Sequence, residues 1–187
     1  MSSSPGLVGR LLVAAPMLTD PNFRRTVVLM LDHGDHGATG LVLNRPLQVE
    51  VAAVLPGWQS FLTDPAVLFQ GGPVGLDSAL GVVGVPGDGI EPPGVRRVVG
   101  SLGLVDLDTP PETVAGGVTG VRIFAGHSGW ESGQLEQELD EGAWFLVDGE
   151  SRDAFTPRPG ELWRDVLRRQ RGALAYLSSY PEDPSSN

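Results

Sequence analysis

The stretch Ala125–Leu139 reads AGHSGWESGQLEQEL and joins an apolar run to a helical pattern. The run before it, Val118–Phe124, is rich in β-branched and apolar residues, which is typical of a strand. After three glycines and a tryptophan, Leu135 and Leu139 lie one helical turn apart, and Gly133 stands where a helix cap belongs. We therefore predict a strand, a sharply shaped connection and a helix, with the rest of the fold organised around them.

Most of the remaining chain consists of short apolar segments that end at Gly, Pro, Asn or Asp, a pattern typical of strands joined by tight turns. Its 26 glycines and 16 prolines favour many turns over a helical bundle. Thr26–Leu31 is apolar and β-branched, so we expect a strand buried on both faces, followed by a polar hairpin loop at Asp32–Gly37. The predicted strands cover residues 7–15, 26–31, 38–44, 66–70, 78–85, 96–104, 118–124 and 143–147.

Helical patterns are fewer. One short helix is expected at 49–54, and another begins with Thr109 as its N-cap and ends at Gly116. The longest predicted helix, Glu161–Leu177, carries one apolar stripe. Strands with hairpins and interspersed helices, without a regular βαβ alternation, predict an α+β fold with a bent, mostly antiparallel sheet.

Length and composition narrow the class of protein. A chain of 187 residues suits a single domain, expected over residues 7–180 with flexible tails at 1–6 and 181–187. The net charge of -10 disfavours binding to nucleic acid. The chain has no cysteine and none of its 13 basic residues is lysine, which excludes thiolate and Schiff-base lysine chemistry. No apolar run approaches the roughly 20 residues of a membrane span, and the N-terminal residues do not form a signal-peptide pattern. We therefore expect a cytoplasmic monomer without a membrane contact.

The three histidines are the candidate metal ligands. His33 and His36 are three residues apart in a loop that also carries Asp32, and zinc or a similar ion would need His127 to converge on them. An H-x-x-H pair in a loop fixes no geometry, and Asp, Gly and His are common turn residues. We assign no metal and no cofactor, and keep an enzyme that uses these three histidines as an alternative.

Other catalytic patterns are incomplete. Ser128 lies in Gly-His-Ser-Gly-Trp, which does not match the G-x-S-x-G elbow of a serine hydrolase. The acids from Glu131 to Glu141 fit an exposed helix face, and the arginines of 164–171 fit either a surface helix or a local phosphate contact. We therefore assign no catalytic residue, and favour a non-catalytic binding or regulatory module.

An ordered set of motifs carries a resemblance to known proteins. The motifs are LVAAP at 12–16, DPNF at 20–23, TVVL at 26–29, GATGLVLNRP at 37–46, GGPV at 71–74, GW at 129–130 and GQLEQEL at 133–139. Over roughly residues 9–178 they resemble the YqgE/AlgH family of bacterial proteins. The resemblance implies a compact α+β domain with a barrel-like core and peripheral helices, and it implies no known activity. Family members are often labelled transcriptional regulators, a further alternative to which the acidic composition gives little support.

One part of the opening stretch departs from the family pattern. His127 and Ser128 stand where the family usually has an aromatic residue and Ala, and Glu131 follows where Gly is common. Polar and glycine positions that do match the motifs define a candidate surface for an unknown protein or small-molecule ligand. Its residues are Asn44, Arg45, Gly71, Gly72, Trp130, Gln134 and Glu136.

Overall fold

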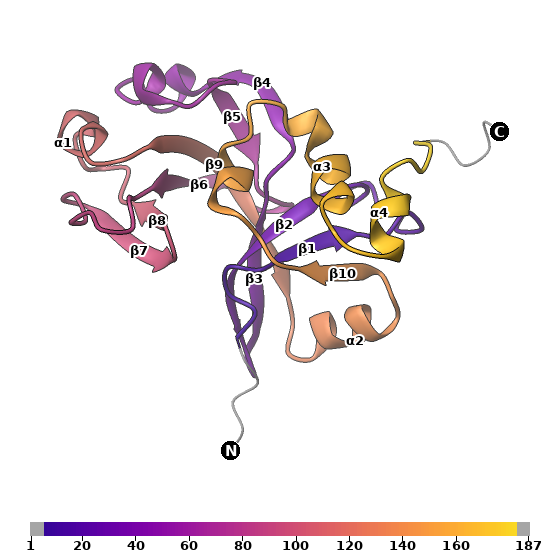
Figure 1. Ribbon diagram of the computed structural model, residues 1–187. Coiled ribbons are helices and arrows are strands. Elements are labelled where there is room, and N and C mark those ends of the chain that lie inside the picture. The colour runs from indigo at the N-terminus through magenta and orange to yellow at the C-terminus, as the bar shows by residue number, and fades with distance from the viewer. Residues whose placement is uncertain (1–5, 183–187) are drawn as a thin grey trace.

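A computed structural model describes residues 6–182 as one α+β domain, which confirms the predicted class. Its ten-stranded sheet has the order β10-β1-β2-β3-β9-β6-β8-β7, while β4 pairs with β5 and β5 pairs with β9. Figure 1 shows the sheet bent into two arms that diverge from β9, so that it curls like half a barrel. The first arm consists of β10, β1, β2 and β3, and the second arm consists of β6, β8 and β7. The strands are β1 Leu11–Ala14, β2 Val27–Gly34, β3 Gly37–Val42, β4 Pro46–Glu50, β5 Val67–Gln70, β6 Val74–Gly84, β7 Val95–Val99, β8 Leu102–Val105, β9 Gly120–Trp130 and β10 Trp144–Val147.

The two arms meet on β9. Its first half, Gly120–Ala125, pairs with β6, whereas its last residues pair with β3, where Trp130 lies opposite Ala38. Between these halves Gly126 has a φ of 72°, and a Cβ at this position would lie 2.6 Å from the carbonyl oxygen of Gly72. Only glycine fits both that conformation and that close backbone contact. The bend of the sheet therefore depends on a glycine inside the stretch Ala125–Leu139.

Apolar side chains fill both faces of the first arm. In β1, Leu11 and Val13 join a cluster that also includes residues of the second arm, so this cluster lies inside the curl. Leu12 and Ala14 join a separate cluster on the outer face, and all four residues are buried. Val27–Met30 of β2 is buried in the same alternating way, which confirms the predicted two-faced burial.

Helices and 3-10 turns cover these clusters. Trp163 and Val166 of α3 close the inside of the curl, Leu135 of α2 covers the outer face of the first arm, and Val114 of α1 covers the outer face of the second. Among residues 6–182, no helix is both long and apolar enough to cross a membrane. The helices are α1 Pro111–Ala115, α2 Gln134–Asp140, α3 Leu162–Arg168 and α4 Ala173–Leu177, with 3-10 turns at Val51–Ala53, Gln59–Phe61, Ser151–Phe155 and Pro159–Glu161.

Several predicted strand boundaries are wrong, because backbone pairing continues through residues that usually form turns. β9 runs on to Trp130 through the predicted connection, held there by β3. The predicted strand 96–104 is instead the hairpin of β7 and β8, which reverses at Gly100 with a φ of 53°. The predicted loop 32–37 shrinks to Asp35 and His36, since β2 and β3 pair as far as Gly34 and Gly37.

The helix predictions also need correction. The expected helix 49–54 is the end of β4 and a 3-10 turn, because Glu50 pairs with Val67 of β5. The expected helix 161–177 breaks into α3 and α4 at Gly172, which has a φ of 75°. The N-cap of α1 is Pro110 rather than Thr109. Of the expected tails, residues 1–5 and 183–187 lie outside the described residues.

Candidate functional site

The loop Asp20–Thr26 joins β1 to β2 and is the point where several sequence motifs converge. Asp20 closes an Asx turn by accepting the amide of Asn22 at 2.8 Å, and its carbonyl accepts the amide of Arg24 at 2.8 Å. Arg25 follows with a φ of 56°, a left-handed conformation that is unusual for a residue with a side chain. The chain then enters β2. The loop thus has a defined, partly strained backbone, and it carries two adjacent arginines.

Asn44 and Arg45 hold this loop from the neighbouring strand end. The side-chain nitrogen of Asn44 donates to the Arg25 carbonyl at 2.9 Å, and its oxygen accepts the amide of Val27 at 3.0 Å. The Arg45 guanidinium donates to two further loop carbonyls, each at 2.9 Å. These bonds satisfy backbone groups that the turn leaves without partners. Asn44 and Arg45 therefore fix the conformation of the loop, and Arg45 also lines a surface pocket.

Phe23 anchors the other side of the same loop. Its ring stacks on Trp130 at a centroid distance of 6.1 Å and meets Trp144 edge-on at 5.5 Å. The carboxylate of Glu138 accepts both indole N–H groups, at 3.4 Å for Trp130 and 3.2 Å for Trp144. Gln134 donates to the same carboxylate at 3.1 Å. Trp130 thus packs against the loop through Phe23, and Gln134 bonds to the carboxylate that also holds the Trp130 indole. Trp130 is only 6% exposed.

An open pocket of about 480 Å³ lies against this loop. Three of its lining residues are cationic, and we call it the arginine pocket. Its lining consists of Thr19, Pro21, Arg24, Arg25, Arg45 and Glu182.

The arginine pocket concentrates positive charge in an acidic protein. Burial lowers the pKa of Arg45, and burial together with the nearby charge of Arg164 lowers the pKa of Arg25. Within residues 6–182, none of Arg24, Arg25 and Arg45 forms an ion pair with a carboxylate. Nη1 of Arg25 is buried without a hydrogen-bond partner in the same part of the chain. The pocket therefore gathers three cations that bond to backbone carbonyls and whose charge is not paired with a carboxylate among residues 6–182.

The remaining candidate residues have partners inside the fold. Gly71 and Gly72 are both buried, and a Cβ on Gly72 would lie 2.2 Å from the backbone of His127. The Glu136 carboxylate contacts His33 at 2.7 Å, and this hydrogen bond lowers the pKa of Glu136. Of the seven residues, Arg45 alone lines the arginine pocket, with Asn44 beside it in the chain.

The three histidines occupy separate positions. His33 pairs with Glu136, and His36 pairs with Asp32 at 2.7 Å. His127 lies on β9 opposite Val74, three residues before Trp130, which corresponds to roughly 10 Å along a strand. Among residues 6–182 no group of three His, Cys, Asp or Glu side chains could hold a metal ion. The buried hydroxyl of Ser128 donates to the Gly71 carbonyl at 3.1 Å, so it braces the bend of β9.

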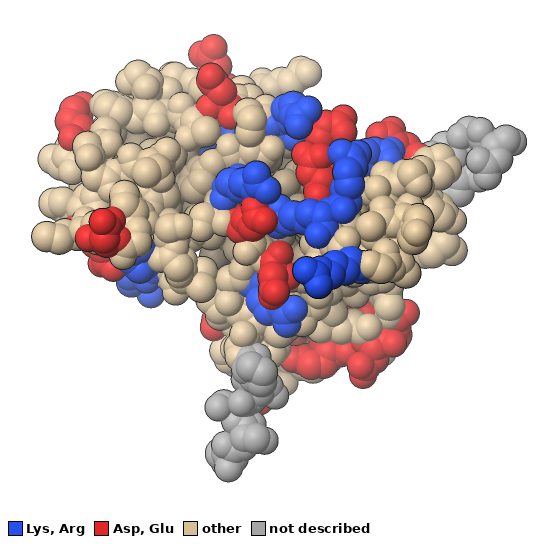
Figure 2. Space-filling view, in the orientation of Figure 1, with Lys and Arg blue, Asp and Glu red and all other residues tan. Residues whose placement is uncertain are grey.

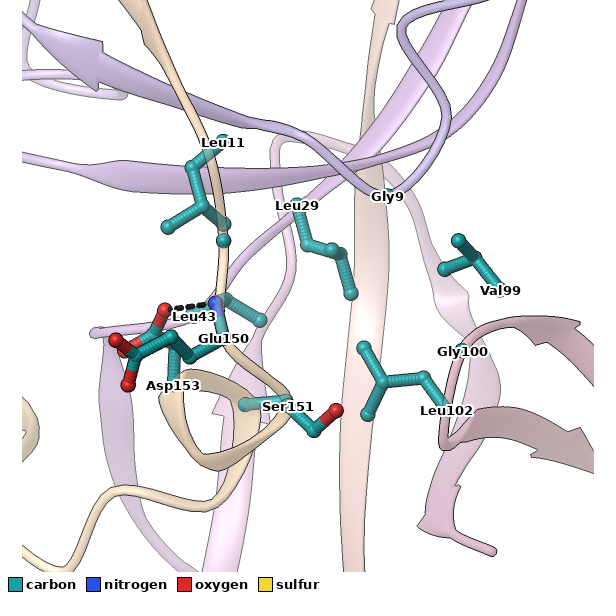
Figure 3. Close-up of a pocket in the computed structure, with 12 residues that line it drawn as sticks. Gly9, Leu11, Leu29, Leu43, Val99, Gly100, Leu102, Glu150, Ser151 and Asp153 are labelled. Carbon is teal, nitrogen blue, oxygen red and sulfur yellow. Dashed lines mark hydrogen bonds between the residues drawn. The ribbon is translucent and has the colours of Figure 1, made fainter. Parts of the chain in front are cut away.

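A smaller cavity of about 110 Å³ lies inside the curl of the sheet. Figure 3 shows Leu29 and Leu102, from the two arms, pointing toward one another across it, with Ser151 and Glu150 at its polar end. These polar groups have partners: Glu150 pairs with Arg152, and Asp153 pairs with Arg169 at 2.5 Å. The cavity therefore lies between apolar side chains of the two arms, and its charged lining residues, Glu150 and Asp153, are already paired.

Three of the four arginines in residues 164–171 have partners inside the fold, and the fourth, Arg171, is exposed. Arg168 pairs with Asp165 at 3.5 Å, Arg169 binds Asp153 through two nitrogens, and Arg164 donates to the Ser178 carbonyl. Figure 2 shows basic and acidic side chains interleaved on this face of the molecule. Such alternation gives a phosphate backbone little net attraction.

The fold and site define the class: a single-domain α+β half-barrel with a clamped loop beside a cationic pocket. The chain belongs to the AlgH-like family, whose model matches residues 11–175. It is 56% identical over 190 residues to the UPF0301 protein SCO2948 of Streptomyces coelicolor, covering 100% of this chain and 98% of that protein.

Two solved structures share the fold. The crystal structure of protein DIP2367 from Corynebacterium diphtheriae is 33% identical, with a TM-score of 0.88 over 96% of this chain and 95% of that chain. The solution structure of the AlgH protein from Pseudomonas aeruginosa is 30% identical, with a TM-score of 0.70 over 97% of each chain. The family of UPF0301 proteins is uncharacterised, so membership establishes the fold and leaves the activity open.

Sequence reasoning missed five of the six lining residues of the pocket, among them the charged residues Arg24, Arg25 and Glu182. A signal was present, since two adjacent arginines follow directly on the DPNF motif in a chain of net charge -10. Glu182 carried no signal, because its place depends on how the end of the chain folds back.

Proposed function

We propose that this protein is a non-catalytic binding module that recognises an anionic group of its partner at the arginine pocket. The observation that carries the proposal is the gathering of Arg24, Arg25 and Arg45 around one open hollow in a protein of net charge -10. Guanidinium groups bind carboxylates and phosphates with strong, directional hydrogen bonds. A cytoplasmic location and a monomeric state stay predictions from composition.

The pocket is supported by a rigid frame. The Arg25 guanidinium lies 4.2 Å over the ring of Trp163, and Arg45 is held by its bonds to the loop. Donors that are already positioned lose little conformational freedom when a ligand arrives. This preorganisation favours a binding role.

The two alternatives have weaker support. An enzyme using His33, His36 and His127 lacks a shared centre, since His33 and His36 pair with different carboxylates and His127 lies on β9 opposite Val74. A transcriptional regulator lacks an uninterrupted basic surface on α3. Neither alternative explains why the arginines of the pocket remain without ion-pair partners in the described chain.

A fluorescently labelled hexaglutamate peptide is the first probe, with inorganic pyrophosphate as competitor. We expect saturable binding that weakens about tenfold between low salt and 0.5 M NaCl, because screening shortens the Debye length from roughly 10 Å at 0.1 M toward 3 Å at 1 M. Arg24→Ala should weaken binding at least tenfold, whereas Arg171→Ala, which removes an exposed arginine between α3 and α4, should not. Equal losses in both variants would show a general charge effect and refute the proposal.

A further inference from the structure

We infer that the ligand of the arginine pocket is an acidic peptide, and that the chain's own segment Tyr180–Glu182 is bound there as a built-in peptide. This inference rests on the proposed function of the same pocket. Three consecutive backbone carbonyls of this segment accept hydrogen bonds from the two loop arginines. Nη2 of Arg25 donates to the Tyr180 carbonyl at 2.8 Å and to the Pro181 carbonyl at 2.5 Å, and Nη2 of Arg24 donates to the Glu182 carbonyl.

The contacts are of the kind that recognise a main chain. All three acceptors are backbone oxygens, so the arginines bind the segment without requiring particular side chains at Tyr180 or Glu182. Pro181 fixes its own φ near the extended range and restricts the residue before it to extended conformations. A proline-restricted segment loses little conformational entropy when its carbonyls are bound, and for that reason proline-containing segments are frequent ligands of preformed grooves.

Charge adds a preference for acidic segments. Glu182 lines the pocket. Burial and the positive charge of Arg164 lower the pKa of Arg25, and the negative charge of Glu182 partly opposes this lowering. With Arg24, Arg45 and Arg164 nearby, a second carboxylate would meet further positive charge.

The site is also separate from the core. Pro181 and Glu182 belong to none of the three apolar clusters, whereas Arg25 is fixed from below by Trp163 and through its carbonyl by Asn44. Displacement of the terminal segment would therefore expose the arginines without disturbing the loop that carries them. A partner peptide and the terminal segment would compete for the same donors.

The test uses the full chain and a labelled synthetic peptide with the sequence of residues 178–187. In the Glu182→Arg variant, a cation replaces the acid of the terminal segment beside the arginines, so the segment should leave the pocket. We expect the peptide to bind this variant about fivefold or more tightly than the unaltered chain, because an attached segment competes at an effective concentration near the millimolar range. Adding Arg24→Ala to the same variant should remove the binding.

Asp88→Arg is the control, since it makes the same change of net charge at an exposed position in the other arm. Equal peptide affinity for the unaltered chain, Asp88→Arg and Glu182→Arg would overturn the inference, and so would binding that does not depend on Arg24. The hexaglutamate probe separates the two claims. If it still binds in an Arg24-dependent way, the anionic-partner function stands while the built-in peptide is refuted; if it does not bind, the proposed function itself fails.

Discussion

Single residues in this protein have roles that their type alone does not reveal. Asn44 and Arg45 form part of a motif that suggests a ligand surface, yet their side chains make four hydrogen bonds to the loop Asp20–Thr26 or the strand after it. Three of these bonds are donated to backbone carbonyls, and one is accepted from the Val27 amide. Gly126 and Gly129 lie three residues apart on the same strand, but they differ in backbone conformation and in the space around them. The first is enclosed with a positive φ, and the second has open space where a Cβ would point.

This contrast gives the first prediction. Gly126→Ala should lower the free energy of unfolding by about 2–4 kcal/mol, because the new Cβ would meet the Gly72 carbonyl and the backbone would be strained. Gly129→Ala is the matched control and should change it by less than about 0.5 kcal/mol. Urea denaturation of both variants measures the difference. Similar losses would mean that the bend of β9 does not depend on Gly126.

A second prediction concerns the contact of Glu136 with His33. Because the hydrogen bond from His33 lowers the folded-state pKa of Glu136, the contact stabilises the protein above the ordinary pKa of a glutamate, and this contribution is lost as the pH falls through the lowered value. The carboxylate is half exposed, so the effect should stay below about 1 kcal/mol.

Thermal unfolding of Glu136→Gln checks that prediction. The variant should melt below the unaltered protein at pH 6 and approach it near pH 3. Glu131→Gln, at an exposed position three residues before Gln134, serves as the comparison. A gap that widens as the pH falls would have the wrong sign for this account.

At the scale of elements, the curl is held together by contacts that cross between distant segments. Arg122 of β9 is 1% exposed and donates to the Ala154 carbonyl at 3.1 Å and to the Asp64 carbonyl at 2.7 Å. Its guanidinium lies 4.4 Å over the ring of Phe69. Burial lowers the pKa of Arg122 to about 10, so the cation is retained at neutral pH at a cost that its bonds and packing offset.

The third prediction follows from these contacts. Arg122→Ala should lower the free energy of unfolding by about 3 kcal/mol, since it leaves a cavity and two carbonyls without their donor. Arg122→Met should lose less than half as much, because it keeps the volume over Phe69 and removes the buried charge. Chemical denaturation compares the two. An equal loss in both would show that the hydrogen bonds alone, without the packing, account for the role of Arg122.

At the scale of the whole molecule, the sequence allowed the class of fold to be predicted but not the paths of its longest elements. The two-faced burial of β2 follows from apolar residues alone, and so do the helix after Gly133 and the preference for antiparallel strands. The continuation of β9 through Gly126–Trp130 depends on pairing with β3, in which Ala38, the partner of Trp130, lies 92 residues earlier in the chain. No local pattern contains that pairing.

The candidate site, like the fold, could be predicted from the sequence only in part. Arg45 was recognised because it lies in a motif, but its neighbours in the pocket were not, because Arg24, Arg25 and Glu182 come together only when the loop and the C-terminal segment fold. Trp130 and Gly72 also lie in the motifs, but both are buried, so their role is in packing and not in ligand contact. A motif in one sequence therefore does not separate residues that shape a loop from residues that face a ligand.

The arginine pocket, as proposed, is the place where this protein binds an acidic peptide. The most direct measurement is a two-dimensional ¹H–¹⁵N NMR titration of the full chain with the hexaglutamate peptide. We predict that shifted signals concentrate in residues 19–26, at Arg45 and in the segment 180–182, with the indole N–H of Trp163 shifting as well. Shifts that concentrate instead around the cavity between Leu29 and Leu102, or along the arginines of α3, would contradict the account, as would a spectrum that does not change.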